Sequence, residues 1–202
     1  MKMLKNIVFD LGGVVVAHNA ESFKAKLGEF FSFVFGPDMK CVPMFWQDYD
    51  RGVLTIDETA AEVAKFRNCT AEVAKEHMLY AISLQEEVEP TAKLIKELKE
   101  KGYKLYVLSN MSKEYIEFLR KLPVFEYFDA QVVSCEVGLG KPDRRIYEHL
   151  LTSCELNPAE TIFIDDRRDN VEAAEELGIV PFHFALNDPE GSCEELRKII
   201  YG

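Results

Sequence analysis

Carboxylate side chains follow two apolar runs of this chain, each at the point where the run ends. Asp10 follows the run Asn6-Ile-Val-Phe, and the pair Asp165-Asp166 ends the run that starts at Thr161. Such runs predict buried strands, and open α/β sheets bind ligands beyond the carboxyl ends of their strands. A carboxylate there costs desolvation free energy unless a cation or hydrogen-bond donors meet it. The pattern favours a cation site, and an Asp that only starts a turn is the alternative.

Two further segments supply groups that bind phosphate. The apolar run from Lys104 ends in Ser109-Asn110, and Lys141 stands just before Pro142, which suits the start of a helix. Carboxylates hold a hard divalent cation through oxygen, whereas lysine and small donors hold phosphate oxygens. Each segment alone is more often a turn or a solvated surface group. Together the four predict a site for a metal and a phosphoryl group.

The order and spacing of these motifs resemble the haloacid dehalogenase-like (HAD) hydrolase superfamily over nearly the whole chain. Within the superfamily the chain is most similar to bacterial phosphatases that act on glucose 1-phosphate. The shared motifs are Asp-Leu-Gly at 10–12, Leu-Ser-Asn at 108–110, Lys-Pro with a following Arg-Ile-Tyr at 141–147, and Asp-Asp with a following Asp-Asn at 165–170.

The resemblance implies a role for each motif residue. Asp10 is expected to be the nucleophile that forms an aspartyl-phosphate, and Lys141 the second catalytic residue, lying between Asp10 and the phosphate. Ser109 and Asn110 are expected to bind phosphate oxygens, with Lys141. The resemblance thus implies a hydrolase, and most specifically a phosphatase of small phosphorylated metabolites.

The expected cofactor is Mg²⁺, which needs few protein ligands and keeps several waters. Its expected ligands are Asp10, the backbone carbonyl of Gly12, and the pair Asp165 and Asp166. We favour Asp166 as the direct ligand of that pair, with Asp165 close by or acting through water. A charged loop that caps the following helix is the alternative role of the pair.

Gly12 departs from the pattern of most phosphatases in the superfamily, which place a second Asp there as general acid and base. General acid–base catalysis contributes ~10²–10⁴ in rate, so the loss matters. Three consequences are possible. The enzyme is slow, or a residue of the cap supplies the acid, or the leaving group departs readily without being protonated. His18 is a candidate acid in the second case, although a linker residue is the plainer interpretation. The anomeric hydroxyl of a sugar 1-phosphate suits the third case, because it is more acidic than an ordinary alcohol.

Strands alternate with helices along most of the chain, which predicts an α/β fold with a doubly wound parallel sheet. The alternation stops between residues 17 and 87, where the pattern is helical. We therefore expect a HAD-like catalytic core of residues 1–16 and 88–202 and a helical cap of residues 17–87. The expected strands of the core, after the first, cover residues 104–108, 130–134, 161–165 and 179–184.

Several helix signals support this division. The residues Phe23, Leu27, Phe30 and Phe31 are spaced for one helix face, and Thr55-Ile-Asp-Glu58 is a capping box before Val63 and Phe66. Thr70 is expected to cap the next helix, with a stripe of Val73, His77 and Ala81. In the core, Ser192-Cys-Glu-Glu195 is expected to open the last helix as a second capping box.

The segment Trp46–Gly52 is expected to form a loop between two cap helices. It combines aromatic side chains with Arg51, which is a candidate to bind the substrate. Trp46 and Tyr49 fit the apolar core of the cap equally well, and we favour the core for Trp46.

Composition limits the partners. The 202 residues carry a net charge of −11 and are 48% hydrophobic, which suits a packed core and disfavours nucleic-acid binding. No run approaches the ~18 apolar residues of a membrane span, and no apolar segment resembles a signal sequence. Five scattered cysteines without a CxxC spacing favour reduced thiols and a cytoplasmic location, and Cys135 is expected to be a structural thiol. The expected partner is a small phosphate ester, and the pattern does not decide the oligomeric state.

Three alternatives to the phosphatase remain open at this stage. A dehalogenase of the same superfamily would need neither a metal nor the Asp165-Asp166 pair. A phospho-accepting signalling domain also combines acidic residues, a hydroxyl and a lysine, but it is shorter and carries its acidic pair at the first strand. A catalytically weak phosphate-binding protein is the third, because Gly12 cannot move a proton.

Overall fold

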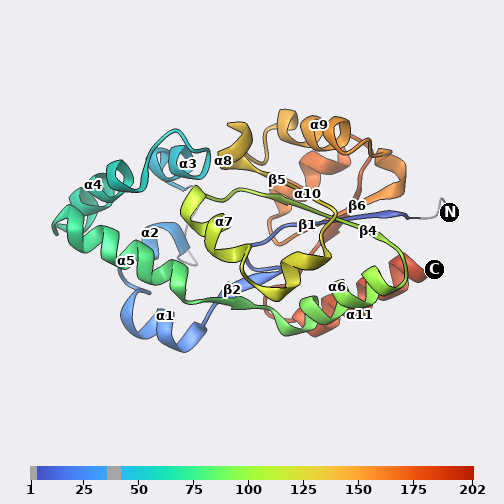
Figure 1. Ribbon diagram of the computed structural model, residues 1–202, viewed down its shortest axis with the longest axis horizontal. Helices are drawn as coiled ribbons and strands as arrows, with labels where there is room; N and C mark the ends of the chain where they lie inside the picture. The colour runs from blue at the N-terminus through green and yellow to red at the C-terminus, as the bar shows by residue number, and fades with distance from the viewer. Residues whose placement is uncertain (1–3, 36–41) are drawn as a thin grey trace.

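The computed structural model describes residues 4–35 and 42–202 of the chain. Its centre is a five-stranded parallel sheet in the order β5-β4-β1-β6-β7 (Figure 1). The strands are β1 (Asn6–Phe9), β4 (Lys104–Ser109), β5 (Ala130–Val133), β6 (Thr161–Asp165) and β7 (Val180–His183). The predicted α/β fold with a parallel sheet is confirmed.

Both faces of the sheet are buried, as the continuous apolar runs of the strands require. In β1, Ile7 and Phe9 belong to one apolar cluster and Val8 to another, because successive side chains of a strand point to opposite faces. β1 pairs in parallel with β4 and with β6, so that Asn6 lies opposite both Lys104 and Thr161. The carboxyl ends of the three strands therefore meet at one edge.

Helices cover both faces. The first cluster joins the sheet to apolar residues of α6 (Glu89–Glu100), α7 (Lys113–Leu119), the 3₁₀ helix η1 (Pro123–Tyr127) and α11 (Pro189–Tyr201). The second joins it to α9 (Arg144–Ser153) and α10 (Arg168–Glu175). Two short helices, α8 (Ser134–Val137) and η2 (Pro158–Glu160), lie in the connections. This is the doubly wound arrangement that the alternation of strands and helices predicts.

In the described part of the chain, five helices precede β3, and they lie together at one end of the molecule (Figure 1). They are α1 (Ala20–Lys26), α2 (Ser32–Phe35), α3 (Met44–Asp50), α4 (Ile56–Arg67) and α5 (Ala71–Ser83). Their apolar side chains form a cluster of their own, in which Leu27, Phe31, Trp46 and Met78 are buried. A separate core is what a cap needs, and we propose that residues 17–87 form one.

A two-stranded antiparallel ribbon, which the sequence patterns do not predict, connects the helices to the sheet. Strand β2 (Val16–His18) carries the chain out, and β3 (Gln85–Glu87) carries it back, with His18 opposite Gln85. Polar side chains dominate β3, so it lacks the apolar alternation by which strands are recognised.

The structure confirms two of the predicted helix caps and contradicts a third. Thr55 and Glu58 form the predicted capping box, and Thr70 caps α5 as predicted. The capping box predicted at Ser192 is wrong. Helix α11 begins at Pro189, the Asp188 carboxylate accepts from Gly191 N, and Ser192 Oγ accepts from Ala185 N.

The cap differs from prediction in its details. Residues 44–50 form helix α3 rather than a loop, and Trp46 is buried in the cap core as favoured. Helix α1 ends at Lys26, so the predicted single face through Phe31 spans a turn. In α4 Phe66 is 59% exposed. In α5 the buried residues are Ala74, Met78, Ala81 and Ile82, so the predicted stripe is right for Ala81 and wrong for Val73 and His77.

Among residues 4–35 and 42–202, no helix is both long and apolar enough to cross a membrane. The cysteines in these ranges, Cys69, Cys135, Cys154 and Cys193, are free thiols, whereas Cys41 lies outside the described residues. Burial raises the pKa of Cys135 to about 11, which fits a structural thiol rather than a nucleophile.

Candidate active site

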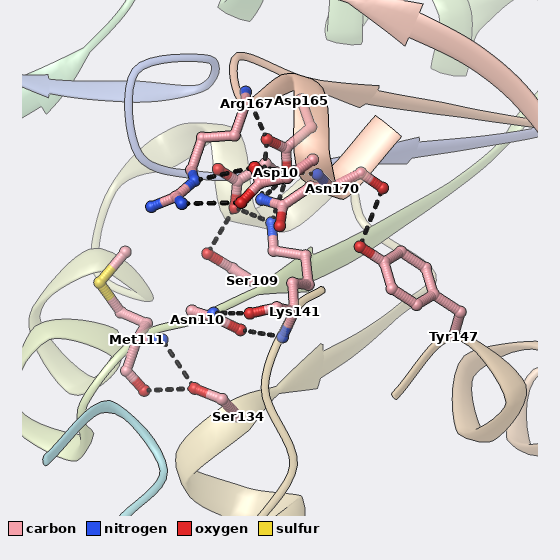
Figure 2. Close-up of polar contacts among 11 residues, drawn as sticks. Asp10, Ser109, Asn110, Met111, Ser134, Lys141, Tyr147, Asp165, Arg167 and Asn170 are labelled. Carbon is pink, nitrogen blue, oxygen red and sulfur yellow. Dashed lines mark hydrogen bonds and ion pairs between the residues drawn. The ribbon is translucent and has the colours of Figure 1, made fainter. Parts of the chain in front are cut away.

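The motif residues meet at the carboxyl edge of the sheet (Figure 2). Asp10 follows β1 directly, and its backbone N–H donates to the Ile164 carbonyl of β6 at 2.8 Å. Ser109 is the last residue of β4 and Asp165 the last of β6. Three adjacent parallel strands thus carry these side chains to one place, as the sequence predicts.

The Asp10 carboxylate is buried and is held through one of its two oxygens. Ser109 Oγ donates to Asp10 Oδ1 at 2.7 Å, and Lys141 Nζ lies 2.8 Å from the same oxygen. Among the described residues no hydrogen bond falls on Oδ2. The carboxylate is therefore oriented by two donors and still has an oxygen available for a metal or a substrate.

Lys141 bridges two carboxylates from within the protein. Its side chain is 2% exposed, and Nζ lies 2.6 Å from Asp165 Oδ2 as well as near Asp10. The ammonium also stands 5.3 Å from the centroid of the Phe163 ring. Burial alone would lower the pKa of Lys141, but Asp10 and Asp165 outweigh it and raise the pKa. The lysine is thus a fixed positive charge.

The Asn110 side-chain amide is hydrogen-bonded to the main chain of Lys141. Asn110 Nδ2 donates to the Lys141 carbonyl at 2.8 Å, and the Lys141 N–H donates to Asn110 Oδ1 at 2.7 Å. The predicted substrate-binding role of the Asn110 side chain has no support in these contacts. Its geometry supports a positioning role for the lysine loop.

Asp165 has every oxygen engaged. Oδ1 accepts from Arg167 N–H at 2.8 Å, Oδ2 is bound to Lys141, and Asn170 Nδ2 lies 3.0 Å from both oxygens. Asn170 is itself buried, and its carbonyl accepts from Tyr147 Oη at 3.0 Å. The Asp-Asn pair after Asp165-Asp166 signals Asn170 in the sequence, where it could equally cap the helix. Tyr147 ends the Arg-Ile-Tyr motif, but the sequence gives no role for it.

Asp166 has different surroundings. Carboxylate oxygens of Asp10, Asp165 and Asp166 all lie within 4.8 Å of one another. Burial, followed by the charges of Asp10 and Asp165, raises the pKa of Asp166 to about 7. Among the described residues no side-chain donor contacts the Asp166 carboxylate. It is therefore the member of the pair that no side chain of the described residues holds.

The donor set fits a hard divalent cation. Three carboxylates face one lysine, so the cluster carries two formal negative charges in excess when all three are ionised. In the turn after Asp10, backbone N–H groups donate to the carbonyls of Leu11 and Val16, and none donates to that of Gly12. Carboxylate oxygens plus a free carbonyl are the ligands that Mg²⁺ takes in proteins.

Arg51 lies outside this network. Its guanidinium lies 2.6 Å from Asp48 Oδ1, and it contacts the Met44 sulfur. The neighbouring residue Asp50 connects the cap to the core, because its carbonyl accepts from Ser134 Oγ. The same hydroxyl accepts from Met111 N–H at 2.9 Å (Figure 2). In the described ranges, the polar contacts of Arg51 do not place its side chain among the carboxylates.

Comparison with known proteins identifies the family of this chain. The family model of haloacid dehalogenase-like hydrolases matches residues 4–178. The chain belongs to this family. It is therefore a HAD-like hydrolase, and the likeness stated from its motifs is confirmed at the level of the superfamily.

Two curated relatives of this HAD-like hydrolase cover nearly its whole length. The sesquiterpene phosphatase of Aspergillus oryzae is 28% identical over 199 residues, which are 97% of this chain and 96% of the relative. The D-ribitol-5-phosphate phosphatase of Bacteroides thetaiotaomicron is 30% identical over 193 residues, 89% and 91% of the two chains. Neither is named a glucose-1-phosphate phosphatase, so that closer likeness stays a prediction.

A solved structure shares the architecture. The HAD family enzyme of Bacteroides thetaiotaomicron in its magnesium complex superposes with a TM-score of 0.72 at 25% identity, covering 90% of this chain and 93% of that one. Dehalogenases also share the fold, one with a TM-score of 0.71 at 16% identity. Similarity of fold alone thus does not decide between the two chemistries.

Proposed function

We propose that this HAD-like hydrolase is a Mg²⁺-dependent phosphatase of small phosphorylated metabolites that works through an aspartyl-phosphate. The observation that supports it best is the Asp10 carboxylate. Its Oδ1 is held by Ser109 and Lys141, while Oδ2 accepts no hydrogen bond from the described residues. A carboxylate oriented in this way is a nucleophile in position.

The first step forms a bond between an Asp10 oxygen and phosphorus and breaks the bond from phosphorus to the leaving oxygen, which takes the electron pair and then a proton. Lys141 and the Ser109 hydroxyl, which hold Asp10 before substrate arrives, turn to the phosphate oxygens as negative charge moves there. In the second step, water attacks the aspartyl-phosphate, which releases inorganic phosphate and restores Asp10.

Magnesium supplies charge neutralisation, so that a phosphate ester can approach a cluster rich in carboxylates. Asp10, the Gly12 carbonyl and Asp166 would hold the ion. Asp165, with both oxygens engaged, fixes Lys141 and would contact the ion only through water. This division supports the preference for Asp166 as the direct ligand.

The substrate we propose is a sugar phosphate, and specifically a hexose 1-phosphate. Gly12 has no side chain to protonate the leaving oxygen. Burial lowers the pKa of His18 to about 4, which leaves the imidazole neutral at pH 7 and argues against it as the missing acid. A leaving group of low basicity, such as an anomeric hydroxyl, removes the need for one.

The test of the proposed activity is phosphate release from p-nitrophenyl phosphate by the purified protein. Wild type with Mg²⁺ is expected to turn over, and Asp10→Asn or added EDTA is expected to abolish turnover, because the nucleophile or the charge-neutralising ion is lost. Halide release from a haloacid without metal would instead identify a dehalogenase. Absence of both activities would identify a phosphate-binding protein.

The choice of substrate has its own test. Glucose 1-phosphate is expected to be hydrolysed with a kcat about tenfold above that for glucose 6-phosphate, a small part of the ~10²–10⁴ that a general acid supplies. The two esters carry the same sugar and the same charge, which makes the pair its own control. An equal kcat, or a preference for the 6-phosphate, would contradict the argument from Gly12.

A further inference from the structure

A leucine side chain lies against the turn that follows Asp10, although more than half of its surface is exposed. Leu186 is 55% exposed and belongs to the loop between β7 and α11. A Cβ added to Gly13 would lie 2.5 Å from Leu186 Cδ2, so a methyl group of the leucine packs directly on the Gly13 backbone. Single exposed leucines are ordinary on protein surfaces. This one calls for a reason because it contacts the loop of the reacting centre.

The Asp166 carboxylate adjoins the same point. Its Cγ and Oδ2 both lie 3.5 Å from the Cβ position of Gly13. Leu186 and Asp166 belong to loops that follow two adjacent strands, because β7 pairs with β6 in parallel. The leucine therefore lies beside two segments that would hold Mg²⁺, the turn with the Gly12 carbonyl and the Asp166 carboxylate.

The backbone of Gly13 makes this close approach possible. Gly13 adopts φ +79°, in the left-handed region that favours glycine, and its N–H donates to the Val16 carbonyl at 2.7 Å. A side chain there would displace the leucine, because 2.5 Å is well inside the contact distance of two carbon atoms. Among the described residues, no atom beyond the chain neighbours of Gly12 lies within 4 Å of a Cβ added to Gly12. The close contact therefore belongs to Gly13 alone of the two glycines.

The loop that carries Leu186 is fixed where it leaves the sheet. Phe184 N–H donates to the Asp165 carbonyl at 2.9 Å, and the Phe184 ring is buried in the core. The next N–H, that of Ala185, donates to Ser192 Oγ of helix α11 at 3.0 Å. A side chain on a loop held in this way can keep other groups in place.

The same strand also fixes the main chain of Asp166. The Asp166 carbonyl accepts from His183 Nε2 at 2.9 Å, and His183 is the last residue of β7. Within the described ranges, no side-chain donor holds the Asp166 carboxylate itself. Its main chain is thus held by β7, and Leu186, three residues after His183, limits the space into which the carboxylate can turn.

We propose that Leu186 is a positioning residue of the metal site, which holds the Gly12–Gly13 turn and the Asp166 carboxylate at the separation that Mg²⁺ needs. The proposal rests on the Mg²⁺-dependent phosphatase proposed above. Magnesium demands nearly ideal octahedral geometry, so a displaced ligand lowers its affinity. Groups packed around metal ligands orient them and control the access of water, and losing such a group typically costs ~10–100-fold in metal affinity or activity.

The experiment titrates the EDTA-treated protein with MgCl₂ in a calorimeter, which measures metal affinity without turnover. Leu186→Ala removes the methyl groups that pack on Gly13, and it is expected to raise the Kd for Mg²⁺ by about tenfold, the lower end of that range. The Mg²⁺ concentration that gives half-maximal phosphate release is expected to rise by a similar factor. Leu186→Met keeps an apolar side chain of similar volume and is expected to bind Mg²⁺ within about threefold of wild type.

Leu79→Ala is the matched control. Leu79 is 46% exposed and lies on helix α5 of the cap, so the variant loses the same groups from a side chain of similar exposure. It is expected to leave the Kd for Mg²⁺ unchanged, and melting temperatures show that each variant is folded. An unchanged Kd in Leu186→Ala would overturn the proposal, as would an equal rise in Leu79→Ala.

The titration also separates this proposal from the proposed activity. Wild type that binds Mg²⁺ but releases no phosphate would contradict the phosphatase, while the Kd values of the variants would still decide the role of Leu186. Wild type that binds no Mg²⁺ would overturn both.

Discussion

The neighbouring carboxylates Asp165 and Asp166 have different surroundings in the structure. Their roles therefore differ, although the sequence alone does not distinguish them. Asp165 is fully buried and receives hydrogen bonds from Lys141, the Arg167 N–H and Asn170. Within residues 4–35 and 42–202, Asp166 receives none from a side chain, and the charges of Asp10 and Asp165 outweigh that of Lys141 on it. The first therefore positions the lysine, and the second is available to a cation.

Asn170 offers the sharpest test at this scale, because it contacts Asp165 and no other carboxylate of the site. Asn170→Ala leaves the Asp165 oxygens short of a donor and lets the carboxylate and Lys141 shift. We expect kcat to fall by about tenfold, the lower end of the range for residues that orient metal-site ligands. Phosphate release and the melting temperature would both be measured.

Asn157→Ala is the matched control. Asn157 accepts from Ala159 N–H at 3.1 Å at the start of η2, so its loss costs about 1 kcal/mol of stability as a helix cap. It is expected to lower the melting temperature without lowering kcat. If both variants lowered kcat in proportion to stability, Asn170 would have no positioning role.

At the scale of elements, sequence reasoning succeeds where a single local signal decides and fails where tertiary contacts decide. The apolar runs predict β4 and β6 to within one residue. They also predict the location of the site, because Asp10, Ser109 and Asp165 lie at the ends of strands. The ribbon strand β3 is too short and too polar to be recognised. At the last helix, the N-cap residue is Asp188 and not Ser192 as predicted.

The same distinction applies within the site. Lys141 and Asp165 can be predicted because their motifs are spaced along strand ends and loops in a recognisable order. The commitment of Asn110 to the Lys141 main chain depends on how two loops meet in space. The ion pair between Arg51 and Asp48 depends on helix α3, a segment that the sequence analysis expects to be a loop.

The loop after α3 packs closely against the core at Gly52. Gly52 adopts φ +71°, and a Cβ added there would lie 2.7 Å from the Cys135 carbonyl oxygen. Gly52→Ala therefore costs about 1 kcal/mol for the backbone and also pushes the loop off the core. We expect kcat/KM for sugar phosphates to fall ~10-fold or more, because the cap no longer meets the site correctly.

Gly102→Ala separates the two effects. Gly102 also has a positive φ, +86°, but an added Cβ meets nothing within 4 Å. The Gly102→Ala variant is expected to lose about as much folding stability as Gly52→Ala through its backbone, while its kcat/KM stays unchanged. Unchanged kcat/KM in Gly52→Ala would show that the close approach to Cys135 has no bearing on the site.

At the scale of the whole molecule, the net charge of −11 and the carboxylate cluster make stability depend on cations. Three carboxylates within 4.8 Å repel one another, and Lys141 offsets only part of this. The free protein therefore contains a strained site at its centre, a common cost of function. A divalent ion relieves the strain and binds only the folded state.

Magnesium is accordingly expected to raise the melting temperature. At a concentration ~100 times its Kd it adds about 2.7 kcal/mol, and for a chain of this size each kcal/mol raises Tm by roughly 2–4 °C. Sodium chloride at equal ionic strength is the control for screening of the net charge, and calorimetry is the measurement. An equal rise with sodium would show that screening, and not the site, is responsible.

Asp166→Asn tests whether the cluster itself is the source of the effect. The substitution removes one of the crowded charges, so without magnesium the variant is expected to melt at or above the temperature of wild type. The same substitution removes the carboxylate without a side-chain donor, so magnesium is expected to add little to the variant. The two melting curves should therefore cross as magnesium is added, with wild type the less stable protein at first and the more stable one at saturation. A variant that is destabilised without magnesium, or that gains as much from it as wild type, would place the ion elsewhere.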